Sequence, residues 1–189
     1  MRMKAWIGLL MAMLVVASGY GAEEENQWDF VVGASFVSKD FFADSDEIFN
    51  DYGWLGVSLG FEHWVGRNIS VRGSCDVLFS GDDYDYADGS YMNTMVVPSI
   101  YGQWFFAGDR LLYLSVGASI AFPFTNSDYF DYSTGGFGAG GGLGVAFLDG
   151  RQKVEIGYFY LPVNVEATES GIIDDYNFGG PMIRYFAGF

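Results

Sequence analysis

The stretch WLGVSLGFEHWVGRNISVRGSCDVLFS, residues 54–80, consists of two alternating segments joined by one tight turn at Gly66-Arg67-Asn68. From Leu55 to Phe61, apolar side chains alternate with glycine and serine, and the segment 69–80 repeats the alternation. A period of two residues is that of a β-strand, whose successive side chains point to opposite faces. The stretch therefore predicts a hairpin with one apolar face and one face of small, polar or charged residues.

The same alternation recurs along the rest of the chain. Six further segments show it: 27–38, 92–105, 112–122, 136–148, 153–161 and 181–189. The connections between these segments alternate strictly between short turns, at 66–68, 107–109 and 149–150, and long polar loops. Strands of about ten residues that alternate in this way are the signature of a transmembrane barrel. A soluble sandwich also alternates, but its turns need not sort by length. We therefore predict an all-β fold, an eight-stranded antiparallel up-and-down transmembrane barrel.

Charge sorts with the loops. The chain has 24 acidic and nine basic residues, and a formal charge of −15. The long loops hold 15 of the acidic residues and one base, Lys39, whereas Arg67, Arg110 and Arg151 lie at the short turns. Basic turns suit an anionic phospholipid head-group layer, and the acidic, tyrosine-rich end would face outward. So acidic a chain is not expected to bind nucleic acid, which requires clustered cations.

The first residues, MRMKAWIGLLMAMLVVASGYGA, have the layout of a secretory signal. Arg2 and Lys4 precede an apolar run that is short for a membrane-spanning helix. We predict a helical signal peptide over 1–22, cleaved at about 19–22, and a barrel domain over 23–189. An uncleaved N-terminal anchor is the alternative.

Charged residues on the predicted inner face indicate an ionic cluster in the lumen. An eight-stranded barrel is just wide enough for side chains to fill it, and charges in so tight a space are expected to pair. Folding the hairpin about Arg67 brings Glu62 opposite Arg72, and Glu155 and Arg184 fall on neighbouring strands. The predicted lumen cluster comprises Glu62, Arg72, Asp76, Lys153, Glu155 and Arg184. A plug is the expected role and a gated ion path the alternative. Glycines on the inner face of 136–148 are expected to make room for Tyr101, Tyr113 and Phe159.

The terminal stretch PMIRYFAGF, residues 181–189, places Ile183, Tyr185 and Phe189 on one apolar face. With the alternation of the whole chain after residue 22, this strand resembles the small eight-stranded outer-membrane barrels of the OmpX/OmpA transmembrane type. The resemblance implies that the terminal strand is a signal for the barrel-assembly machinery, with Ala187 in place of a larger residue. It also implies a bacterial outer-membrane location and contact with outer-membrane lipids. Within such a barrel, Phe189 is expected to lie at the head-group level.

Other motifs give weak signals. Gly136–Gly141 matches a dinucleotide fingerprint but lacks the helix and acidic partner that the fingerprint needs. His63, the only histidine, and Cys75, the only cysteine, take outward positions. The stretch Asp83–Gly89 resembles a calcium loop, but Ala87 stands at a ligand position. Weak divalent-cation binding by the acidic loops is left as a hypothesis.

Together these patterns predict a non-catalytic structural or surface-interaction protein with no cofactor, no catalytic residue and no dedicated metal site. We expect a monomer whose acidic loops meet an extracellular ligand or partner that the sequence does not identify. The alternatives are a narrow porin-like channel or small-ligand conduit, and a lipid-modifying barrel enzyme that uses His63.

Overall fold

A computed structural model describes residues 28–38, 53–84, 89–106, 110–125, 130–132, 136–167 and 173–189. The predicted signal peptide at 1–22 and most of the acidic loop residues lie outside these ranges. So do residues 85–88 of the calcium-like stretch. Within the described ranges, no helix is long and apolar enough to cross a membrane.

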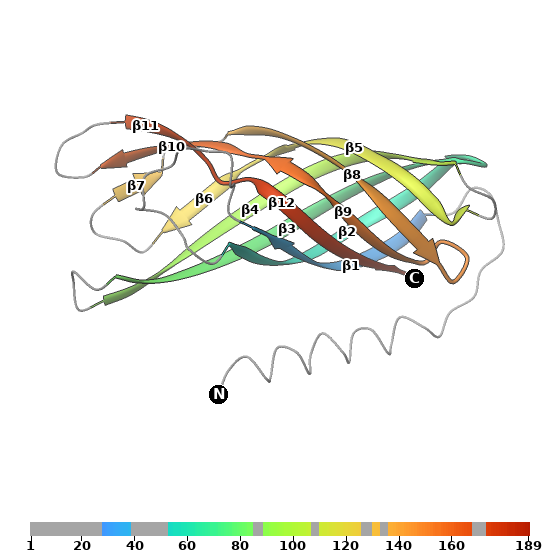
Figure 1. Ribbon diagram of the computed structural model, residues 1–189, viewed down its shortest axis with the longest axis horizontal. Helices are drawn as coiled ribbons and strands as arrows, with labels where there is room; N and C mark the ends of the chain where they lie inside the picture. The colour runs from blue at the N-terminus through green and yellow to red at the C-terminus, as the bar shows by residue number, and fades with distance from the viewer. Residues whose placement is uncertain are drawn as a thin grey trace.

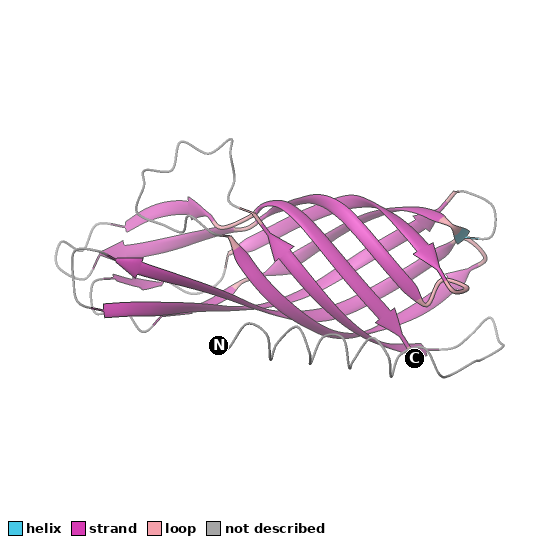
Figure 2. Cartoon of the chain, turned by 60° about the horizontal axis from the view of Figure 1, so that its bottom comes forward, coloured by secondary structure: helices cyan, strands magenta, loops and turns pink. Residues whose placement is uncertain are grey.

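Eight antiparallel strands form a closed barrel, as predicted (Figure 1). Each strand pairs with its neighbour in the chain, and the first pairs with the last. The barrel strands are β1 (Trp28–Val37), β2 (Trp54–Gly66), β3 (Ile69–Tyr84), β4 (Gly89–Phe105), β5 (Leu112–Ile120), β8 (Phe137–Phe147), β9 (Gln152–Tyr160) and β12 (Gly180–Gly188). Figure 2 shows these strands running obliquely around the barrel, the tilt that closure of a sheet requires.

The terminal strand is held on both sides. Strand β12 pairs with β1 from Val31–Gly188 to Val37–Met182, and with β9 on its other edge. The backbone N–H of Phe189 donates to the carbonyl oxygen of Phe30 at 2.9 Å. Because both edges of β12 are paired, its backbone polar groups are satisfied within the wall.

The end of the barrel nearest the long loops contains more strand than the sequence predicted. Parts of the segments 81–91, 123–134 and 162–177, which we predicted to be loops, are strands. The additional elements are β6 (Phe122–Thr125), β7 (Phe130–Tyr132), β10 (Pro162–Ala167) and β11 (Ile173–Asn177). Strand β6 pairs with β4, while β7, β10 and β11 form a separate three-stranded sheet. Strand β6 pairs with β4 and β7 pairs with β10, which are distant in sequence, whereas β10 and β11 form a local hairpin. Turn composition does not reveal the distant pairings.

Side chains alternate between the outside and the lumen along the barrel strands. On β2 the outward Leu55, Leu59 and Phe61 are each more than half exposed, whereas the inward Ser58 and Glu62 are buried. Large exposed apolar side chains occur on every barrel strand, among them Phe36, Ile69, Ile100, Val116, Leu143, Ile156 and Ile183. The molecule is therefore apolar outside and carries buried charges inside, the reverse of a water-soluble domain.

Glycines on the inner face of β8 make room for large side chains, as predicted. A Cβ built on Gly144 would lie 2.1 Å from the ring of Tyr113. One on Gly140 would lie 2.9 Å from the Tyr101 hydroxyl and 3.0 Å from the Phe159 ring. The narrow lumen accepts these rings only because the facing strand carries no side chain at those positions.

Candidate functional site in the barrel lumen

The lumen has two regions of different chemistry, stacked along the barrel axis. We call the region nearest the short turns the polar half; its members are Glu62, Ser70, Arg72, Gln103, Lys153, Glu155 and Arg184, all buried. The region nearest the long loops is the apolar half, an eleven-residue cluster of buried hydrophobic side chains: Val37, Trp54, Leu78, Met95, Val97, Ala121, Phe159, Leu161, Val163, Phe178 and Met182.

The first ion pair of the polar half joins Lys153 and Glu62 across the lumen. The Lys153 Nζ also donates to Gln103 Oε1 at 2.9 Å, and the Ser70 hydroxyl donates to the same oxygen at 3.0 Å. The ion pair links β9 to β2. The two hydrogen bonds to Gln103 link β9 and β3 to β4. Because each partner is nearly inaccessible to solvent, the pair is screened little by salt.

The second group is a charged triad. Glu155 forms a salt bridge with Arg184, which lies directly opposite it in the β9–β12 register. The other oxygen of Glu155 lies 3.7 Å from an Arg72 terminal nitrogen. One carboxylate thus bridges two guanidinium groups, from β3 and β12, in the middle of the barrel.

Arg72 is held by rings as well as by charge. Its guanidinium carbon lies 3.6 Å from the centre of the Phe186 ring and 5.4 Å from that of Tyr101. Arg184 lies 4.1 Å from the same Tyr101 ring. Among the described residues, the Arg72 side chain finds no hydrogen-bond acceptor of suitable geometry. Its stabilisation comes from cation–π contact and from the charge of Glu155.

The pairing differs from that suggested by the fold of the hairpin. Glu62 does lie opposite Arg72 in the β2–β3 register, but the two do not form an ion pair; Glu62 pairs with Lys153 instead. Arg72 is directed to Glu155 and Phe186. Hairpin geometry specifies neighbours within the wall, whereas long side chains also reach across the lumen, so cross-strand register alone does not predict partners.

Asp76 stands apart from the ion pairs. It is buried four residues beyond Arg72 on β3, toward the long loops, and accepts a hydrogen bond from the Ser58 hydroxyl. Within the described ranges it forms no salt bridge with Arg72 or Arg184. Asp29, which sequence also placed inward, is half-buried near the barrel's short-turn end.

An aromatic group closes the polar half on the side of the short turns. Trp64 packs on Phe105, whose ring centre lies 4.8 Å away, and Phe105 packs on Tyr113 at 5.1 Å. Lys153 Nζ lies 5.1–5.8 Å from the ring centres of these three residues. The Arg110 guanidinium covers Trp64 from outside at 4.1 Å.

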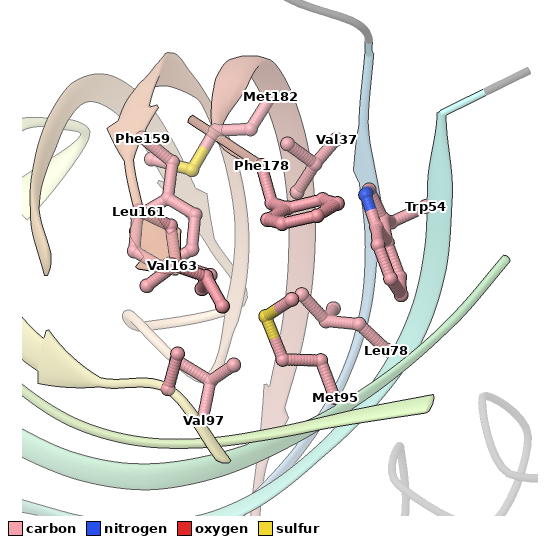
Figure 3. Close-up of a cluster of buried hydrophobic side chains, with 11 residues drawn as sticks. Val37, Trp54, Leu78, Met95, Val97, Phe159, Leu161, Val163, Phe178 and Met182 are labelled. Carbon is pink, nitrogen blue, oxygen red and sulfur yellow. The ribbon is translucent and has the colours of Figure 1, made fainter. Parts of the chain in front are cut away.

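The apolar half was missed by the sequence analysis. Figure 3 shows Trp54, Phe178 and Met95 directed toward the middle of the barrel. The signal was present: near the long loops, the inward positions of several strands change from polar to apolar residues, as in Met95 and Val97 on β4.

The remaining candidate residues lie on the outer surface. His63 stacks on Trp28 with ring centres 4.6 Å apart, and Cys75 is an exposed free thiol. Ile183 is exposed on β12 and Tyr185 is half-buried, while the Phe189 ring lies 6.4 Å from that of Phe30. The glycine fingerprint is largely within β8, which leads to β9 and not to a helix. No group of three or more metal-ligating side chains occurs among the described residues.

No protein-family model matches the sequence, and no curated protein matches it significantly. Among solved structures, the chain is similar to the Yersinia pestis outer membrane protein Ail in a phospholipid nanodisc, at 14% identity over 86% of this chain and 100% of that one, with a TM-score of 0.46. It is also similar to the outer membrane protein AlkL in DMPC bilayers, at 16% identity, 90% and 92% coverage, and a TM-score of 0.41. Likenesses this distant carry no functional inference for this chain.

Proposed function

We propose that this protein is an integral barrel of a bacterial outer membrane, with a structural or surface-interaction role and no catalysis. The observation that carries the proposal is the reversed distribution of side chains. Exposed apolar residues cover the outside of all eight strands, while six charged residues are buried within. Water would penalise the first feature, whereas hydrocarbon around a closed wall favours both.

The height of the apolar surface supports this location. On β2, exposed apolar side chains run from Leu55 to Val65, ten residue steps along the strand. At about 3.4 Å per residue and a tilt of about 45°, this length spans roughly 25 Å, the height of the apolar band of outer-membrane barrels. Trp28 and Trp104 are exposed near the short turns, where an aromatic belt would meet the head groups.

The lumen supports a closed barrel in preference to a pore. The Lys153–Glu62 and Glu155–Arg72 pairs of the polar half cross the lumen, and a cluster of buried apolar side chains fills the other half. An ion entering this path would have to displace both. The acidic loops would then carry the interaction with an extracellular ligand, and the β12 strand would be the segment read by the assembly machinery.

Fractionation and conductance test the proposal. The protein should remain with membranes after alkaline extraction and require detergent for release; recovery as a compact monomer in detergent-free aqueous extract would contradict the proposal.

In planar bilayers the protein should give no steady unitary openings. Openings that Arg72→Ala abolishes would favour the narrow channel instead. Lipid analysis with and without His63→Ala should show no change, and altered lipid products would favour the enzyme.

A further inference from the structure

Two short turns meet at one place on the short-turn end of the barrel. The β2–β3 turn carries Arg67 and the β4–β5 connection carries Arg110. The N–H of Phe105 donates to the Asn68 carbonyl oxygen at 2.8 Å, and Arg110 Nε donates to the Arg67 carbonyl oxygen at 3.0 Å. The Arg110 side chain therefore reaches the turn that carries Arg67, 43 residues away in sequence.

Arg110 is fixed in place before any ligand arrives. One face of its guanidinium lies on Trp64, at 4.1 Å from the ring centre, and Nε is bound to the Arg67 carbonyl. An arginine on a surface normally loses considerable rotamer entropy when it binds an anion. Here that ordering has already occurred, and within the described part of the chain no hydrogen bond or salt bridge occupies the two terminal nitrogens. Paired guanidinium nitrogens match the oxygens of a phosphate.

Among the residues that the structure describes, neither arginine forms a salt bridge. The salt bridges of the described residues join Arg72, Lys153 and Arg184 to buried carboxylates, and none involves Arg67 or Arg110. Arg67 is exposed and Arg110 half-buried. The pair is thus a local concentration of positive charge on a strongly acidic protein.

Apolar side chains surround the two cations and indicate the source of the anion. Val65 and Ile69 flank the Arg67 turn, and Phe106 and Leu111 flank Arg110; all four are about half exposed, at 48–57%. A soluble anion gains nothing from such neighbours. A phospholipid does, because its acyl chains continue from the phosphate onto an apolar surface.

We propose that Arg67 and Arg110 form a binding site for the phosphate of an anionic phospholipid in the leaflet that meets the short turns. The inference rests on the proposed membrane location. The lipid phosphate would take the terminal nitrogens of Arg110 and the charge of Arg67, and the acyl chains would lie against Val65, Ile69, Phe106 and Leu111. The barrel would then retain phosphatidylglycerol in preference to zwitterionic phosphatidylcholine.

Native mass spectrometry of the purified protein tests this. The protein is reconstituted in phosphatidylcholine nanodiscs containing a minor fraction of phosphatidylglycerol, released, and scored for retained lipid of each class. Each basic residue near an anionic lipid surface is worth about a fivefold change in binding. Arg67→Gln with Arg110→Gln should therefore lower phosphatidylglycerol retention by more than about fivefold. Arg151→Gln, which removes one charge from another short turn, is the control and should lower it by no more than the about fivefold effect of one surface charge.

Three results would overturn the site: no phosphatidylglycerol preference in the unmodified protein, an equal loss in Arg151→Gln, or displacement of the lipid by inorganic phosphate alone. The second would indicate a diffuse field and the third a site for soluble anions. Arg110→Lys, which keeps the charge but lacks the planar fork, should bind at an intermediate level. Heat-modified mobility in gels verifies that every variant is folded. A protein that fails to enter nanodiscs contradicts the membrane location, whereas an inserted barrel without lipid preference contradicts only this site.

Discussion

The polar half and the apolar half of the lumen have opposite chemistry, although the same strands line both. Strand β3 contributes Arg72 to one and Leu78 to the other, and β12 contributes Arg184 and Met182. In the polar half, each charge is near a partner from another strand. In the apolar half, packing alone fills the space. The comparison shows that the strands themselves do not decide whether a part of the lumen is polar or apolar. The inward residues at each height decide it, because they must complement one another.

The largest effect is expected at the centre of the charged triad. Glu155→Ala would leave Arg184 and Arg72 buried without their shared carboxylate. Removing one partner of a buried ion pair costs about 3–5 kcal/mol in the free energy of unfolding. Urea unfolding of the barrel in lipid vesicles measures this cost. As a control, the double variant Glu155→Met with Arg184→Met replaces the pair by apolar side chains and should cost less than the single change.

The charged triad depends on which residues lie inside, and that much could be predicted from sequence. Strict alternation assigned Glu62, Arg72, Glu155 and Arg184 to the inner face, because a period of two is retained along every barrel strand. The choice of partners could not be predicted. Lys153 reaches across the lumen to Glu62, and Arg72 selects Phe186, through flexible side chains whose directions no strand pattern records.

A smaller effect is expected in the apolar half. Leu161 is fully buried there, and Leu161→Ala would remove its contacts and leave a cavity. Such truncations cost about 2–4 kcal/mol. The control is Leu143→Ala on the lipid-facing side of β8, where lipid can fill the space. Equal costs at the two positions in the same unfolding assay would show that the apolar half is not packed as a core.

The next effect is expected where a glycine of β8 packs against the ring of Tyr113. A methyl group at Gly144 would lie 2.1–2.5 Å from the ring and hydroxyl atoms of Tyr113, so Gly144→Ala should destabilise the barrel by about 1–3 kcal/mol. Gly73 on the outer face has no atom within 4 Å of the corresponding position. Gly73→Ala is the matched control and should change stability by less than about 0.5 kcal/mol. A reversed order would mean that Tyr113 can move aside.

Glycine placement on β8 was anticipated from sequence, whereas the extension of the wall by β6 was not. Five glycines at every second position from 136 to 144 are a strong pattern, since they remove side chains from one face only. By contrast, the pairing of Phe122–Thr125 with β4 joins segments that are far apart in sequence, and Pro123 follows directly on the predicted strand 112–122. Local composition favours loops there, and tertiary pairing overrides it.

The smallest effect is expected for a neutral hydrogen bond of the polar half. The Ser70 hydroxyl donates to Gln103 Oε1, which also receives Lys153. Because Gln103 keeps its second donor after Ser70→Ala, the cost should be about 1 kcal/mol. Chemical denaturation measures the cost in the free energy of unfolding. The comparison is Ser99→Ala, which loses a contact of 3.0 Å between the Ser99 and Ser74 hydroxyl groups. A cost near that of Glu155→Ala would show that the network acts as a single unit.

The pairing of β1 with β12 has a consequence for biosynthesis. Val31 and Gly188 lie at opposite ends of the barrel sequence, yet they are direct partners. A partly synthesised chain cannot close the barrel, because β1 pairs with β12, the last strand to be made. Until the barrel closes, two unpaired strand edges and an apolar outer surface are exposed to water, which favours aggregation. We therefore expect the chain to be transported unfolded and bound to a chaperone, and the barrel to close only when the chain reaches a lipid environment.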